Sequence, residues 1–174
     1  MDRARRKVAL TPFILLLAGC GFHLRGTADL PFATVYVPGA TGGIALDLAR
    51  NIQAGTNAKV VSDPQAAEAI LQFTGEARDK EILSLTGTGR VREFRLRYRV
   101  GFRVHDGKGH DFVPQNTLEL TRDVSFNDAE VLAKESEEQL LFRDMQGDMV
   151  QQIMRRLSAA QKRAETGAAQ KTRA

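Results

Sequence analysis

Cys20 is the only cysteine in this chain of 174 residues, and it carries the most reactive side chain present. A single thiol cannot form an intramolecular disulfide, and three scattered histidines do not complete a cysteine-rich zinc site. Basic residues open the chain, an apolar run follows from Val8 to Ala18, and the small residue Gly19 stands before Cys20. This order is typical of a secretory signal peptide, and the run is too short to cross roughly 30 Å of hydrocarbon. We therefore predict that residues 1–19 are an export signal that is removed.

The tetrad Leu17-Ala18-Gly19-Cys20 resembles a bacterial lipobox. In that motif diacylglycerol is attached to the cysteine thiol, the chain is cut before it, and the new amino terminus is acylated. An ordinary signal peptide with an incidental cysteine is the alternative. Each buried CH₂ adds about 0.8 kcal/mol, so several acyl chains anchor a protein firmly. We expect a lipid on Cys20, no other cofactor, and no transmembrane helix after it.

In the segment from Arg90 to Val104, the even positions from Phe94 on are apolar, and the odd positions are Arg95, Arg97, Arg99, Gly101 and Arg103. A period of two predicts a strand with one face in the core. Guanidinium groups at roughly 7 Å spacing can address several anionic groups at once. The alternative is pairing across strands, but Glu119 and Asp123 are two acids for four arginines, so a surplus of positive charge is expected. The candidate binding residues are Arg95, Arg97, Arg99 and Arg103.

Other polar clusters give little reason to expect catalysis. The segment from His105 to Asp111 holds two histidines and two aspartates, but its glycines favour a hairpin turn over a metal site. The segment from Leu85 to Gly89 lacks the lysine of a phosphate-binding loop and reads as a flexible connection, and no serine lies in a G-x-S-x-G motif. We predict no catalytic residue, no metal and no enzyme, with a lipid-anchored hydrolase as the less favoured alternative.

The basic composition mostly reflects the export signal. The chain has 25 Lys and Arg against 21 Asp and Glu, a net charge of +4. Residues 1–19 hold four of these basic residues and one acid, which leaves 21 against 20 in the mature chain. Export and a nearly neutral mature chain argue against nucleic acid as a partner. A content of 43% hydrophobic and 26% charged residues indicates one globular domain.

The predicted elements are five strands and two helices. Strands are expected at 33–37, 59–61, 69–74, 90–104 and 111–124, with helices at 44–55 and from Asn127 to about Leu157. The second helix carries an apolar stripe of Leu141, Met145, Met149, Ile153 and Leu157, which we interpret as core. The predicted fold is α+β: a two-layer sandwich with two helices on one face of a mixed, mainly antiparallel sheet of four to five strands. Residues 20–157 form the domain, and residues 158–174 are expected to be a disordered polar tail.

The segment Cys20-Gly21-Phe22-His23-Leu24-Arg25-Gly26 resembles the opening of the LPS-assembly lipoproteins, the LptE family. The resemblance implies a lipid-anchored sandwich that plugs the outer-membrane β-barrel LptD, assists its folding and helps deliver lipopolysaccharide to the outer leaflet. It also implies no catalytic residues, and lipopolysaccharide binding through basic residues, a role that we map onto the arginine row as a hypothesis. Gly21 after Cys20 fits sorting to the outer membrane. A non-catalytic lipoprotein of another envelope assembly is the alternative.

Overall fold

The computed structural model describes residues 29–171, with side chains as far as Ala160. The elements in chain order are β1 (Thr34–Tyr36), α2 (Gly43–Gly55), β2 (Lys59–Val61), β3 (Ala69–Leu85), β4 (Val91–His105), β5 (Asp111–Ser125) and α3 (Val131–Lys171). Short 3-10 turns lie at Pro64–Ala66 and Asp128–Glu130.

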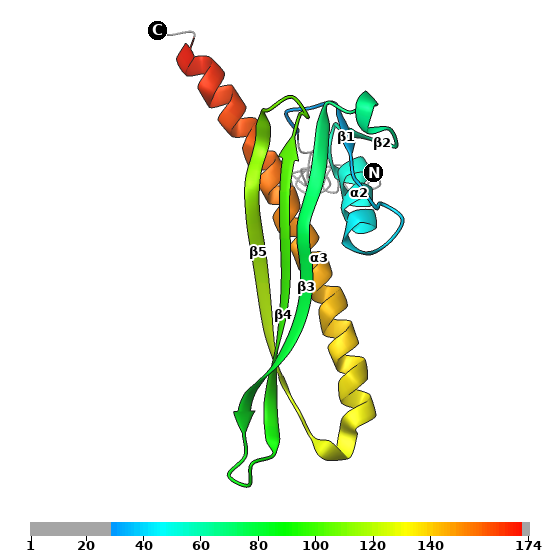
Figure 1. Ribbon diagram of the computed structural model, residues 1–174, viewed down its shortest axis with the longest axis vertical. Coiled ribbons are helices and arrows are strands. Elements are labelled where there is room, and N and C mark those ends of the chain that lie inside the picture. Colours follow the sequence, from blue (N-terminus) through cyan, green and yellow to red (C-terminus); the bar gives the residue numbers. More distant parts are fainter. Residues whose placement is uncertain (1–28, 172–174) are drawn as a thin grey trace, which may run out of the picture.

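The five strands form one sheet in the order β2-β1-β3-β4-β5. Strand β1 is parallel to both β2 and β3, whereas β3, β4 and β5 follow one another in antiparallel pairs. Both helices cover the same face of the sheet (Figure 1). The predicted two-layer α+β sandwich is therefore confirmed.

The molecule is elongated, and its two ends differ (Figure 1). Strands β1 and β2 and helix α2 lie toward one end, which we call the upper end. Strand β3 pairs with β1 only at Ala69 and Ile70, so that beyond them its ladder runs with β4 alone. Three long strands and α3 continue to the opposite end, which we call the distal end, where the β3–β4 turn and the β5–α3 connection lie.

The core confirms the sequence periodicities. The even-numbered residues of β4 from Leu96 to Val104 are fully buried, as are Leu48 and Ile52 of α2. Helix α3 contributes Met145, Met149, Ile153 and Leu157 to the core, and Leu141 is partly buried against it. The two methionines therefore fill core space, as predicted.

A chain of polar contacts joins the sheet to both helices in the middle of the molecule. The Tyr98 hydroxyl donates to Glu76 at 2.8 Å, and the guanidinium of Arg78 lies over the Tyr98 ring. Arg78 donates to Gln146 of α3 at 2.7 Å, and Gln146 in turn donates to Asp47 of α2 at 2.6 Å. Burial, and then the bond to the Glu76 carboxylate, raises the pKa of Tyr98. The phenol therefore stays protonated in the fold and fixes the helix layer to β3 and β4.

Two predicted boundaries are wrong. Strand β3 continues to Leu85 instead of ending near Thr74, because the residues after Thr74 pair with β4 although charged side chains occupy both faces of this part of the strand. Helix α3 continues to Lys171, where a disordered segment was predicted from Ser158. Ala160 is buried in the core, and the alanine, glutamine, lysine and arginine residues that follow are strong helix formers, so the helix propagates beyond the apolar stripe.

Candidate interaction surfaces

The arginine row lies on the sheet face opposite the helices, in the middle of three long strands. The even-numbered side chains of β4 are in the core, so the odd-numbered arginines point outward. Acidic residues of the flanking strands share this face: Asp79 and Glu81 of β3, and Glu119 and Asp123 of β5. The row is therefore bordered by carboxylates on both sides.

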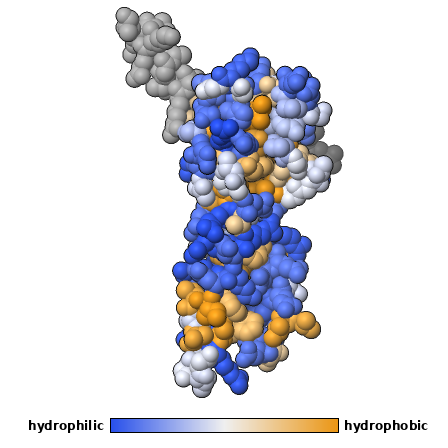
Figure 2. Space-filling view, in the orientation of Figure 1, coloured by the Kyte–Doolittle hydropathy of each residue, from blue (hydrophilic) through white to orange (hydrophobic). Residues whose placement is uncertain are grey.

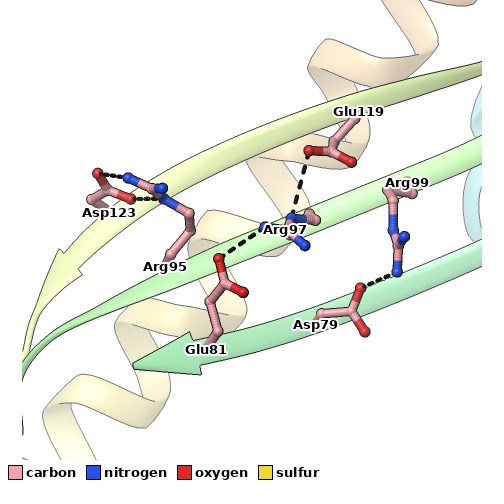
Figure 3. A network of polar contacts seen from close by, with 7 residues as sticks. All are labelled: Asp79, Glu81, Arg95, Arg97, Arg99, Glu119 and Asp123. Carbon is pink, nitrogen blue, oxygen red and sulfur yellow. Dashed lines mark hydrogen bonds and ion pairs between the residues drawn. The ribbon is translucent and has the colours of Figure 1, made fainter. Parts of the chain in front are cut away.

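Arg95 forms a two-pronged ion pair with Asp123, the residue directly opposite it on β5. Its Nε lies 2.8 Å from one carboxylate oxygen and its Nη2 lies 3.0 Å from the other (Figure 3). This hydrogen bond, strengthened by the charge of Arg95, lowers the pKa of Asp123, and the same contact raises the pKa of Arg95. Pairing with Asp123 belongs to the alternative in which carboxylates across the strands neutralise the row, and the structure shows it for Arg95.

Arg97 and Arg99 reach acids diagonally across the strands (Figure 3). Arg97 donates to Glu81 at 2.8 Å, and its Nε lies 3.5 Å from a carboxylate oxygen of Glu119. Arg99 donates to Asp79 at 2.7 Å, although Asp79 lies directly opposite Arg97 in the register. Long guanidinium side chains can span such diagonal positions. The result is a network in which each of these arginines has a carboxylate partner.

The predicted surplus of positive charge is wrong for three of the four arginines. Asp79 and Glu81 were not recognised as members of this face, because the second half of β3 carries charge on both faces and gives no period-two signal. Arg103 differs from the others, since its hydrogen-bond partner is the neutral amide oxygen of Gln72, at 2.6 Å. Within the described residues, Arg103 is the member of the row without an ion pair.

The segment between β4 and β5 is a hairpin turn, as its glycines indicated. The Asp106 carboxylate accepts hydrogen bonds from the backbone N–H groups of Lys108 and His110 at 2.7 and 3.0 Å, which lowers the pKa of Asp106. Gly107 and Gly109 have φ angles of 74° and 107°, in the region that favours glycine. Across residues 29–171, no group of three or more His, Cys, Asp or Glu side chains is arranged to hold a metal ion.

An apolar patch covers the distal end, and the sequence interpretation did not identify it. Figure 2 shows hydrophobic side chains gathered near this end of the molecule. The exposed fraction reaches 79% for Leu132 and 57% for Ile82. The members of this distal patch are Ile82, Leu83, Leu85, Val131, Leu132 and Leu140. Their exposure could not be read from the sequence, because it depends on where β3 and α3 extend past the core.

The lipid-anchor prediction concerns a part of the chain outside the described residues. The export signal 1–19 and Cys20 both precede Asp29, so the geometry of the lipobox is not described. No described helix combines the length and the apolar composition that a membrane crossing needs. The lipid on Cys20 remains a prediction from the sequence.

Comparison with known proteins identifies the family. The family profile described as LptE, Lipopolysaccharide-assembly, matches residues 32–157. An LPS-assembly lipoprotein LptE from Yersinia pestis (strain Pestoides F) is 30% identical over 148 residues, which cover 83% of this chain and 70% of that protein. The LptE of Photorhabdus laumondii is 25% identical over 147 residues, covering 83% and 80% of the two chains. The solution structure of lipoprotein B from Nitrosomonas europaea superposes with a TM-score of 0.70 at 46% identity, covering 82% of this chain and 93% of that one. The chain belongs to the LptE family of lipopolysaccharide-assembly lipoproteins.

Proposed function

We propose that this protein is an outer-membrane lipoprotein that plugs the LptD β-barrel, assists the assembly of that barrel, and takes part in inserting lipopolysaccharide into the outer leaflet. Membership of the LptE family over residues 32–157 is the observation that carries this proposal. The lipobox at Cys20 supports a lipid anchor, and the role is one of binding and assembly, without catalysis. In this proposal the anchor holds the upper end at the membrane, and the domain lies within the barrel lumen or on its periplasmic side.

The outward sheet face suits a polar lumen. Arginine, glutamate, aspartate and threonine side chains cover it, and their ion pairs already satisfy most of its charge. A face of this kind can lie against a water-filled, polar barrel interior with little unpaired charge. The arginine network therefore supports a plug more directly than it supports a strongly cationic binding surface.

On this face, Arg103 is the arginine that lipopolysaccharide can bind with the least displacement of existing partners. A lipid A phosphate that binds Arg97 or Arg99 must displace Glu81 or Asp79, whereas binding to Arg103 displaces only the amide of Gln72. Charge-assisted contacts between guanidinium and phosphate are strong enough to compete with a neutral hydrogen bond. We assign Arg103 the main part in binding phosphate. Arg95, Arg97 and Arg99 contribute only when phosphate replaces their carboxylate partners.

The distal patch is the surface that we assign to the barrel protein. Six exposed apolar side chains at one end of a molecule mark a surface that a partner protein can cover. The charged groups near them include more acids than bases, among them Glu130, Glu135 and Glu137, which disfavours lipid phosphates there. A protein partner with apolar side chains fits this end better.

The test is purification of the full-length chain, with its own signal peptide, from the outer membrane of a Gram-negative host in mild detergent. We expect a large β-barrel protein to co-purify in stoichiometric amount. The double variant Ile82→Ser and Leu132→Ser should reduce that amount, while the control Gln53→Ser and Lys59→Ser at the upper end should leave it unchanged. Recovery of the lipoprotein alone, or with another partner, contradicts the proposal.

Binding to the glycolipid is measured separately, by flotation of the purified protein with vesicles that contain lipid A. We expect Arg103→Glu to lower the bound fraction and Lys59→Glu to leave it unchanged. Equal binding by the native chain and the two variants would exclude the assignment to Arg103. That result would not bear on the proposed barrel partner.

A further inference from the structure

A pocket opens at the upper end, between the beginning of β5 and the C-terminal part of α3. It has a volume of about 80 Å³ and opens to solvent. Most of its wall is apolar, with one guanidinium and one amide. The lining residues are Phe112, Val113, Pro114, Asn116, Arg156, Ala159 and Ala160.

Two polar groups of this pocket lack partners among the described residues. Arg156 is exposed and makes neither an ion pair nor a side-chain hydrogen bond there. The Oδ1 atom of Asn116 is buried without a donor, while its Nδ2 atom donates to the Pro114 carbonyl. A peptide backbone matches both groups, because its carbonyls accept from Arg156 and its N–H groups can donate to Asn116 after a small rotation of that side chain. A phosphate offers only acceptors, so it matches one group alone.

The N-terminal chain enters the fold next to this pocket. Leu30 and Phe32 are buried, and the backbone N–H of Leu30 donates to the Asn57 side chain at 2.8 Å. The Phe32 ring packs edge-on against Phe112, with 5.3 Å between ring centroids, and Phe112 is part of the pocket wall. The residues that precede Leu30 therefore start within a few residues of the pocket. Eight residues separate Cys20 from Asp29, enough to extend roughly 28 Å.

The sequence just after Cys20 has the composition that this pocket fits. In an extended segment, Phe22 and Leu24 project to one side, and His23 and Arg25 project to the other. We propose that residues 21–26 dock between β5 and α3, with the Phe22 side chain in the pocket and the backbone bonded to Arg156 and Asn116. The short connection to Leu30 keeps the segment at high effective concentration beside its site.

Docking shortens the tether between the lipid and the fold. A free segment would leave eight residues between Cys20 and Asp29, whereas a docked Phe22 leaves only Gly21 between the acylated cysteine and the domain. The upper end is then held against the membrane, and the long axis of the molecule has a defined direction relative to it. The segment acts as an orienting strap, a role independent of any barrel or glycolipid.

The test is photo-crosslinking within the full acylated chain, purified in detergent, with p-benzoylphenylalanine in place of Phe22. We expect intramolecular crosslinks to peptides that contain residues 112–116 or 156–160. The same probe at Ala129, at the distal end, is the control and should not reach these peptides. Crosslinks from position 22 that scatter over the surface, or that go only to detergent and lipid, would overturn the proposal.

A variant that blocks the pocket tests whether the crosslinks depend on it. Ala159 is exposed on the pocket wall, so the tryptophan side chain of Ala159→Trp fills the site. Crosslinking from position 22 should then fall several-fold, whereas the control Ala129→Trp should have no effect. If Ala159→Trp disturbs the fold, Phe22→Ser replaces it: hydrogen exchange of amides 23–26 should then become several-fold faster, with no change elsewhere. Unchanged exchange in Phe22→Ser refutes docking. Neither measurement needs LptD or lipopolysaccharide, so failure here leaves the proposed function standing.

Discussion

Reversing the charge of Arg97 tests whether the arginine row is a structural network. In the native protein this guanidinium lies between two carboxylates, 2.8 Å from Glu81 and 3.5 Å from Glu119. The variant Arg97→Glu removes both attractions and places a third carboxylate between them. Arg103→Glu is the matched control, because it is the same change on the same strand and face but disturbs only the hydrogen bond to Gln72.

The expected loss follows from the geometry and the exposure of the groups. Arg97 is 30% exposed and its acid partners are nearly half exposed, so each lost pair is worth up to about 1 kcal/mol. Each new contact between like charges at roughly 4 Å costs about 1 kcal/mol in a water-like dielectric. We therefore expect Arg97→Glu to lower the free energy of unfolding by about 2–3 kcal/mol at low salt. Arg103→Glu should cost less than about 1 kcal/mol.

Urea unfolding followed by circular dichroism measures both variants. At about 1 M salt the Debye length falls to about 3 Å, so most of the repulsion in Arg97→Glu should disappear while the Arg103→Glu value changes little. Adding Glu81→Arg to Arg97→Glu restores one ion pair in reversed order and should recover part of the stability. Equal losses in the two single variants, or a loss in Arg97→Glu that does not respond to salt, would refute the network.

Three further predictions concern the core and the titrating groups. Met149 is fully buried, so Met149→Ala should cost about 2–5 kcal/mol and lower Tm by several degrees in a thermal melt, while Arg155→Ala on the exposed side of α3 should change little. The pKa of Asp123 is lowered in the fold, so its contribution to stability is present above the unfolded pKa of about 3.9 and is lost as the pH falls. The difference in urea midpoint between the native chain and Asp123→Asn should therefore shrink below about pH 4, and a constant difference would contradict this pairing. The pKa of Tyr98 is raised, so stability should fall above about pH 10, where the unfolded chain ionises and the folded chain does not. Tyr98→Phe should show a smaller alkaline loss, and an identical pH profile in the two proteins would place Tyr98 in contact with solvent.

The sequence predicted most where one face of an element is buried along its whole length. Strand β4 alternates arginine with core residues, so its orientation followed directly from its pattern, and the four-residue stripe of α3 identified its packing face in the same way. Strand β3 could not be followed past Thr74 because Arg78 and Lys80, on its helix-facing side, reach Gln146 and Glu138 at the margin of α3 instead of entering the core. A charged side chain at the edge of a helix layer looks the same in a sequence as one in a loop.

Because the second half of β3 was not predicted, the arginine row was expected to carry excess positive charge. The nearer acid partner of Arg97 and the partner of Arg99 come from β3, and their position depends on a register that no local pattern specifies. The exposure of the distal patch was not predicted for a related reason. Apolar residues at the ends of elements predict burial by default, and only the lengths of β3 and α3 show that these side chains extend beyond the core.

Helix α3 also sets a length for the whole molecule. Its 41 residues, at about 1.5 Å per residue, extend roughly 60 Å. The C-terminal part of the helix projects past the upper end of the sheet (Figure 1), so the part between the distal end and the pocket runs from Val131 to Ala160 and is roughly 45 Å long. This length is close to the roughly 40–45 Å thickness of a bilayer with its headgroups. In the proposed arrangement, a domain anchored by its upper end at the inner face of the outer membrane and upright inside a barrel would bring its distal end to about the level of the opposite face. The length of this rigid part therefore matches the thickness of the membrane, and shortening α3 together with the three long strands by equal amounts would withdraw the distal end from the outer surface without altering the anchor.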